Sequence, residues 1–263
     1  MDRLKELGFD GIEVPLVTSI LRSLPVEEMK SRAADAGISC VFCTGLDHRQ
    51  NVASPRKKNR VRGIDHLKRC VDVVKEFNGK TLSGVLYGVW GGFSGSAPTE
   101  QELDRSAESL REVAAYAKGV EVDLAFEPVS RFEGYLIATA AEGMNFINRI
   151  GCDNVGLHLD TFQMNIEEKN MPDAIRLAGD RLFHFHLCAS DRGVPGTGHV
   201  DWEGVFTALR EIRYDRWITV ESFYPEPGAE ASAAKVWRKL AGTPDDIGLG
   251  GLKLFRAYTV QKG

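Results

Sequence analysis

The chain has 263 residues, of which 43% are hydrophobic and 27% are charged, and its formal net charge is −4. This length suits one domain with a large buried core, so we expect residues 1–263 to form a single domain. The acidic balance argues against a nucleic-acid partner, which would favour a basic surface.

The predicted elements alternate between helix and strand along the chain. Residues 2–8 are typical of the end of a helix, closed by Gly8. Apolar residues at period two then predict seven strands: 9–16, 38–46, 81–89, 122–128, 155–162, 182–187 and 217–223. Helical spacing predicts a helix over 25–36 and a long helix that ends at about residue 77. It also predicts helices over 100–118, 139–150, 171–178 and 202–212. Residues 231–260 are predicted to be helical apart from the glycine-rich stretch 248–251.

Four of these strands end in a polar residue on the face opposite their apolar residues. These residues are Glu127, Asp160, His186 and Glu221. The stretches between them are long enough for a helix that connects parallel strands. This rhythm indicates a (β/α)8 barrel of the TIM type, in which sites form at the carboxyl ends of several strands.

Such a barrel should begin with a strand before the helix at residues 2–8, and this sequence shows none there. We therefore expect a TIM-type barrel that lacks its first strand and has two exposed strand edges. The first and last strands would then have to approach each other, admit water, or be covered by another segment or another subunit. An upstream start codon that was missed is the alternative explanation.

The polar residues at the strand ends indicate a metal site. Two Glu, one Asp and one His offer oxygen and nitrogen ligands, which suit one divalent ion such as Mn²⁺, Co²⁺ or Mg²⁺, and of these we expect Mn²⁺. Taken singly, such a His is often a hydrogen-bonded core residue and such a Glu an exposed carboxylate. Their shared parity on successive strands favours the metal site. His158 and His184 lie two residues before Asp160 and His186 on the same strands, and we expect them to orient the metal ligands.

The same carboxylates suggest acid–base chemistry. If Glu127 and Glu221 approach a substrate from opposite sides, one can remove a proton beside a polarised carbonyl while the other returns one. Glu133 and Arg192 lie in loops and could hold substrate hydroxyls, although surface salt bridges would explain them equally well. Trp90 stands in a tight glycine-rich loop that matches no phosphate-binding motif.

Several motifs together resemble the ketose 3-epimerases, the D-tagatose, D-allulose (D-psicose) and L-ribulose 3-epimerase group of xylose-isomerase-like TIM barrels. They are EPVSRFE at 127–133, HLDTFQMNIEE at 158–168, HFH at 184–186, PGTGHVDW at 195–202 and VESF at 220–223. The sequence shows no charged-then-apolar leader and no run of about eighteen apolar residues, so we expect a cytoplasmic protein without a membrane partner. The resemblance implies an isomerase that inverts C3 of a free ketose through an enediolate, and we expect a homo-oligomer, either a dimer or a tetramer.

The resemblance also assigns residues. It implies that Glu127, Asp160, His186 and Glu221 bind the metal, with the two Glu as the acid–base pair. The substrate-binding residues that we expect are Glu133, Arg192, His158, Gln163 and Trp90. Family members commonly carry a His at the position of Gln163. A Gln side chain can donate and accept hydrogen bonds but cannot become a cation, so the substrate preference of this chain could differ from that of those family members.

Three other functions remain open. A hydroxypyruvate or inosose isomerase would use similar metal and acid–base groups. An abasic-site endonuclease would share the barrel but would want more metal ligands and a basic face. A catalytically impaired sugar-binding remnant would fit the missing first strand.

Overall fold

The computed structural model describes residues 1–224 and 235–259 of the chain. Its centre is one parallel sheet in which neighbouring strands follow each other in the sequence. The strands are β1 (Gly11–Pro15), β2 (Ser39–Leu46), β3 (Thr81–Val89), β4 (Asp123–Phe126), β5 (Val155–Asp160), β6 (Leu182–Leu187) and β7 (Ile218–Val220). The expected TIM-type barrel without a first strand is confirmed.

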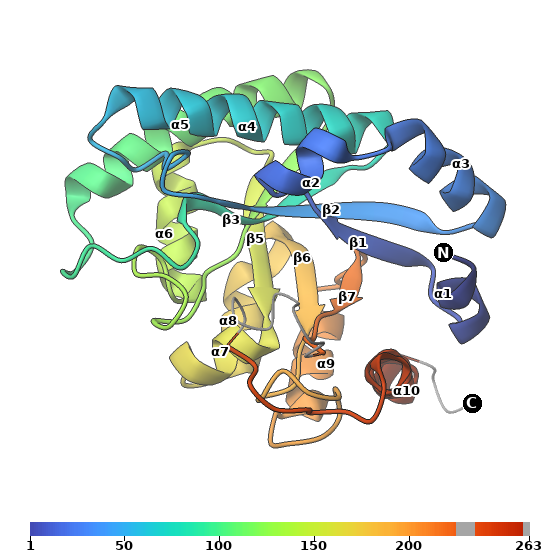
Figure 1. Cartoon of the computed structure of the whole chain (residues 1–263). Coiled ribbons are helices and arrows are strands. Elements are labelled where there is room, and N and C mark those ends of the chain that lie inside the picture. The colour runs from blue at the N-terminus through green and yellow to red at the C-terminus, as the bar shows by residue number, and fades with distance from the viewer. Residues whose placement is uncertain (225–234, 260–263) are drawn as a thin grey trace.

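Helices cover the outside of this curled sheet, as Figure 1 shows. The helices before β4 are α1 (Asp2–Leu7), α2 (Thr18–Ser23), α3 (Val26–Ala36), α4 (Lys57–Glu76) and α5 (Glu100–Gly119). After β4 come α6 (Ala140–Ile150), α7 (Thr161–Glu167), α8 (Met171–Ala178), the 3₁₀ turn η1 (Gly179–Arg181), α9 (Trp202–Glu211) and α10 (Pro244–Thr259). Among the described helices, none is long and apolar enough to cross a membrane.

The ring of strands is open at one place. β1 pairs with β2, and β7 pairs with β6, but within residues 1–224 and 235–259 no pairing joins β7 to β1. We call this gap the seam. The indole ring of Trp217 lies at the seam, so close to Gly11 that a Cβ on this glycine would contact the ring. The seam is where an eighth strand would complete the barrel.

The strand predicted over 155–162 is longer than the strand in the structure. β5 ends at Asp160, and α7 begins at the next residue. The cause is local, because the Asp160 side chain accepts hydrogen bonds from the backbone N–H groups of Phe162 and Gln163 and so caps the helix. The site residue at the end of this strand is therefore also a helix cap.

The predicted interruption of the C-terminal helix is wrong. α10 continues through residues 248–251. Its glycines serve close packing, since a Cβ on Gly251 would collide with Val220 of β7 and one on Gly248 would press on Phe9. Of the predicted helical stretch before it, residues 225–234 lie outside the described residues, and residues 235–243 are not helical.

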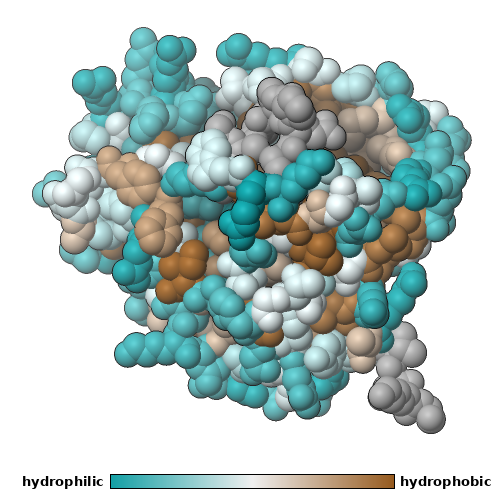
Figure 2. Space-filling view, turned by 60° about the horizontal axis from the view of Figure 1, so that its bottom comes forward, coloured by the Kyte–Doolittle hydropathy of each residue, from teal (hydrophilic) through white to brown (hydrophobic). Residues whose placement is uncertain are grey.

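The core lies between the sheet and the helices. All residues of β5 and β6 are buried, as expected for parallel strands that are covered on both faces. α5 and α6 each begin with a capping box, Thr99 with Glu102 and Thr139 with Glu142, which fixes where these helices start. Figure 2 shows the face at the bottom of Figure 1, where apolar residues are exposed among hydrophilic ones.

Candidate active site

Four neighbouring strands bring the predicted ligands together at their carboxyl ends. Asp160 ends β5, His186 lies in β6, and Glu127 and Glu221 each follow the last residue of their strand. His186 Nδ1 lies 3.5 Å from Asp160 Oδ2 and 3.6 Å from Glu221 Oε1. One ligand atom each from Glu127, Asp160 and His186 lies within 4.8 Å of the others, and the same holds for Asp160, Cys188 and Glu221.

Two buried atoms of this cluster have no hydrogen-bond partner among the described residues. They are Asp160 Oδ2 and His186 Nδ1. A buried polar atom without a partner is costly, and such an atom commonly marks an ion or water site. One carboxylate oxygen and one imidazole nitrogen that face each other in this way fit a divalent cation.

Glu13 of β1 is a site residue that the sequence analysis missed. Its Oε2 lies 2.9 Å from Nε2 of His184 and 2.9 Å from Nε2 of His186, and its Oε1 accepts a hydrogen bond from Ser83 of β3. Its strand parity matched that of the other site residues. However, its partners lie 171 and 173 residues further along the chain, where no local pattern points to them.

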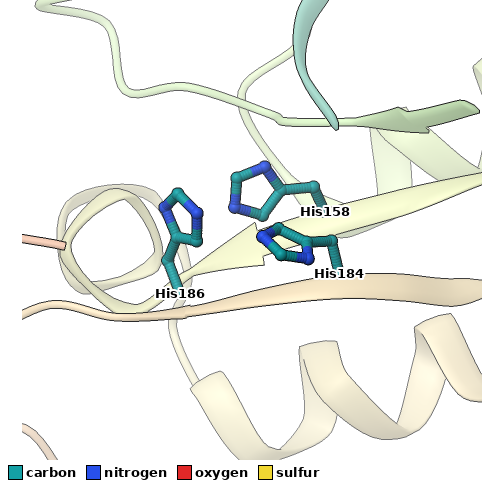
Figure 3. A group of neighbouring side chains, drawn as sticks. All are labelled: His158, His184 and His186. Atoms are coloured by element: carbon teal, nitrogen blue, oxygen red, sulfur yellow. The ribbon is translucent and has the colours of Figure 1, made fainter. Parts of the chain in front are cut away.

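Three imidazole rings lie next to one another at the site, as Figure 3 shows. His158 comes from β5, whereas His184 and His186 come from β6, and the ring centroids of His158 and His186 are 4.0 Å apart in an edge-to-face arrangement. His158 is fully buried, and its Nδ1 lies 3.9 Å from Oε2 of Glu127. His158 thus packs beneath the cluster.

Three of the residues predicted to bind substrate contact a fourth, Glu133, whereas His158 does not. Its Oε2 accepts hydrogen bonds from Nε1 of Trp90 at 3.0 Å and from Nε2 of Gln163 at 3.1 Å, and its Oε1 accepts one from Nη2 of Arg192 at 2.6 Å. Gln163 also accepts the backbone N–H of Ser130 through its Oε1. The surface salt-bridge interpretation does not hold for Glu133 and Arg192, because both side chains are buried.

Arg192 joins this group to the acid–base pair. Its Nη1 donates to Oε2 of Glu221 at 2.7 Å, so one guanidinium contacts two carboxylates. Its guanidinium carbon lies 4.1 Å from the ring centroid of Phe162 and 4.8 Å from that of Phe223. Two aromatic rings and two carboxylates therefore hold the cation. Phe162 and Phe223 both belong to the motifs described above, but nothing in the sequence indicated that they would contact Arg192.

The two Glu of the expected acid–base pair have raised pKa values. Burial, followed by the charge of Glu221, raises the pKa of Glu127 well above its ordinary value. Burial also raises the pKa of Glu221 to about 7, with Asp160 adding to the effect and His186 and Arg192 opposing it. A carboxyl group with a pKa near neutrality can both accept and donate a proton at physiological pH.

The pKa values of His158 and His186 are shifted in opposite directions. Burial opposes the charge of His186, but Glu13 and Asp160 raise its pKa well above the ordinary value. Burial likewise opposes ionisation of Glu13, yet His184 and His186 hold its pKa well below the ordinary value. Burial and the two neighbouring imidazoles lower the pKa of His158, which keeps that ring neutral.

One cavity of about 1350 Å³ connects this site with the seam. Its polar end is lined by Glu127, Glu133, His158, Arg192 and Glu221 among others. Its other end is lined by apolar residues of α1 and α10, including Leu4, Leu7, Phe255 and Tyr258. The volume exceeds the roughly 300–1,000 Å³ of usual ligand pockets, because the space of the seam is added to that of the site.

Known proteins share both the sequence pattern and the fold. Residues 1–240 match the family described as "Xylose isomerase-like TIM barrel". A probable ketose 3-epimerase of Synechocystis is 33% identical over 96% of this chain and 87% of its own length. An L-ribulose 3-epimerase of Mesorhizobium japonicum is 36% identical over 90% of this chain and 79% of its own length. The crystal structure of a Methylomonas D-allulose 3-epimerase in complex with D-allulose is similar, with a TM-score of 0.92 and 30% identity, over 97% of this chain and 88% of that one.

Proposed function

Because the chain belongs to the ketose 3-epimerase family of xylose isomerase-like TIM barrels, we propose that it is an isomerase that inverts C3 of a free ketose. The observation that carries this proposal is the pair of partly buried carboxyl groups, Glu127 and Glu221, which line one cavity from separate strands. Two such groups on separate strands suit removal of a proton from one side of a carbon and its return from the other.

We further propose that one divalent ion is held by Glu127, Asp160, His186 and Glu221. The atoms without partners, Asp160 Oδ2 and His186 Nδ1, support this assignment. Their mixed oxygen and nitrogen donors suit Mn²⁺, Co²⁺ or Mg²⁺, of which we propose Mn²⁺. When bound, the ion would supply Lewis-acid polarisation of the substrate carbonyl.

The remaining steps, which are proton transfer and binding of the sugar, are assigned to side chains of the protein. One Glu removes the C3 proton to give an enediolate, and the other donates a proton to the opposite face of C3. Glu133 accepts three hydrogen bonds from the protein, which leaves one of about four carboxylate lone-pair positions for a sugar hydroxyl. Arg192 keeps positive charge next to Glu221 and so favours its ionised form.

The identity of the ketose is a finer question. Relatives carry the names of both L-ribulose and D-psicose epimerases, a ketopentose and a ketohexose. The contact of Gln163 with Glu133 lies at the substrate end of the cavity, so we propose that this Gln influences which ketose is preferred. A homo-oligomer stays a prediction, which sedimentation velocity would test.

The test is proton exchange in D₂O. Protein loaded with Mn²⁺ is incubated with a panel of ketohexoses and ketopentoses, and NMR follows the label. We expect deuterium at C3 of both the product and the recovered substrate. Label that appears at C1 alone would contradict C3 epimerisation and would favour an aldose–ketose isomerase.

Variants and metal removal complete this test. Glu221→Gln should abolish exchange, and bound metal must be measured because the residue is proposed both as base and as ligand. Glu211→Gln, which changes an exposed carboxylate on α9, is the matched control and should exchange at the wild-type rate. Removal of the ion with a chelator should stop exchange, and added Mn²⁺ should restore it.

A further inference from the structure

The Glu13 carboxylate connects three strands inside the barrel. Glu13 belongs to β1, its Oε1 accepts from Ser83 of β3, and its Oε2 lies 2.9 Å from two imidazole nitrogens of β6. Its side chain is buried. Because one oxygen lies at hydrogen-bonding distance from two ring nitrogens, it determines where the ring protons are placed.

The ionised Glu13 carboxylate fixes the position of the ring protons. An ionised carboxylate can only accept, so Nε2 of His184 and Nε2 of His186 must each carry a hydrogen. An imidazole binds a metal ion only in its singly protonated form, and in that form of His186 the proton on Nε2 leaves Nδ1 with its lone pair. Nδ1 is the atom without a hydrogen-bond partner in the described part of the chain, and it faces Asp160 and Glu221.

The neighbouring rings limit the movement of His186. The His158 ring packs edge-on against it with centroids 4.0 Å apart, and the His184 ring lies 5.1 Å away, as Figure 3 shows. Both neighbours are buried. A ring that is packed on its sides and anchored at Nε2 can present Nδ1 in one direction.

We propose that Glu13 is a positioning residue, which fixes the tautomer and the orientation of His186 so that its Nδ1 binds the divalent ion. This inference rests on the ligand set in the proposed function. Carboxylate partners of this kind orient metal-binding histidines, and their loss typically costs about 10–100-fold in metal affinity.

The first experiment measures Mn²⁺ affinity from the EPR signal of free Mn²⁺. Glu13→Gln should weaken binding by about 10–100-fold, because a neutral amide oxygen accepts the two imidazole N–H groups less strongly than a carboxylate does, and the amide NH₂ replaces the oxygen that accepts from Ser83. Glu13→Asp should bind more tightly than Glu13→Gln, since it restores the carboxylate. The control is Glu168→Gln, which changes a part-buried carboxylate that accepts the N–H of Ala140, far from the histidines in the hydrogen-bond network. It should bind like wild type.

The second experiment reads the ring nitrogens directly, by ¹⁵N NMR of histidine-labelled wild-type protein loaded with diamagnetic Zn²⁺. We expect His186 to be protonated at Nε2 and to bind the ion through Nδ1. This spectrum decides the matter even if Glu13→Gln does not fold, because a proton on Nδ1 would overturn the proposal.

The outcomes separate the two proposals. Wild-type protein that binds no Mn²⁺ would contradict the ligand set on which the inference rests. Wild-type binding together with a folded Glu13→Gln that binds within twofold of it would overturn the role of Glu13 and leave the ligand set standing.

Discussion

Nη2 of Arg192 lies 2.6 Å from Oε1 of Glu133, and both side chains are buried. The other terminal nitrogen of the same guanidinium contacts Glu221. A planar cation with two separate donors therefore joins the group of residues around the proposed sugar position to the proposed acid–base pair. This relationship leads to the first prediction.

Arg192→Lys should lower the free energy of unfolding by about 1–3 kcal/mol, because an ammonium cannot contact both carboxylates and stack on two rings. Urea unfolding monitored by circular dichroism measures the change. Arg176→Lys on α8, whose partners Asp173 and Glu211 are exposed, should change stability by less than about 0.5 kcal/mol. Equal stability of Arg192→Lys and wild type would show that the double contact contributes nothing.

Gln163→Glu tests the contact between the amide and Glu133. The new carboxylate could still accept the N–H of Ser130 but would face a carboxylate where Nε2 now donates. We expect a loss of about 1–3 kcal/mol at neutral pH, with partial recovery when the pair takes up a proton at lower pH. Gln101→Glu, an exposed change on α5, is the control. If both variants unfold at the wild-type urea concentration, the described hydrogen bond has no role in stability.

His66 of α4 gives a prediction about acid. Its ring is buried, its Nε2 lies 3.2 Å from Oγ1 of Thr44, and burial lowers its pKa from 6.5 to about 4. The unfolded chain then binds the proton more readily, so this group should cost stability as pH falls from 6.5 to 4, by up to about 3 kcal/mol. The measurement is the difference in unfolding free energy between wild type and His66→Gln across this range. A difference that does not vary with pH would contradict the assignment.

Hydrogen exchange should reveal the seam. Alternate amides of β1 and β7 face it, and within the described residues no strand pairs with them there. We expect these amides to exchange about two orders of magnitude faster than those of β4 and β5, because edge positions open at little cost. Mass spectrometry of peptic fragments, repeated on diluted protein, makes the comparison. Equal protection at every concentration would show that the seam is covered.

Much of this site could be predicted from the sequence, because the information was local. A strand reveals its parity within a few residues, so Glu127, Asp160, His186 and Glu221 could be grouped from the sequence alone. Burial of Glu133 and Arg192 could not be predicted, because loop positions carry no periodicity. Glu13 was missed because its partners are remote in sequence. The metal ligands and substrate contacts themselves stay predictions.

The errors in the fold had similar causes. Gly248, Gly250 and Gly251 look like a helix break when only propensity is considered, since each glycine costs a helix about 1 kcal/mol. In the structure α10 needs them for close contact with Phe9, Val194 and Val220, respectively. Likewise, the cap made by Asp160 ended β5 early, which periodicity alone does not reveal.

The seam also restricts how copies of this chain could meet. A strand that completes the barrel must run parallel to both β1 and β7, because all described strands are parallel. Two copies related by a two-fold axis would instead pair β1 with β1, and such a pair runs antiparallel. The free edge of β1 cannot pair with a parallel strand and with a second copy of β1 at the same time, so self-association through β1 would compete with ring closure. A ketose analogue that favours the closed ring would then dissociate such dimers from a site that shares one cavity with the seam.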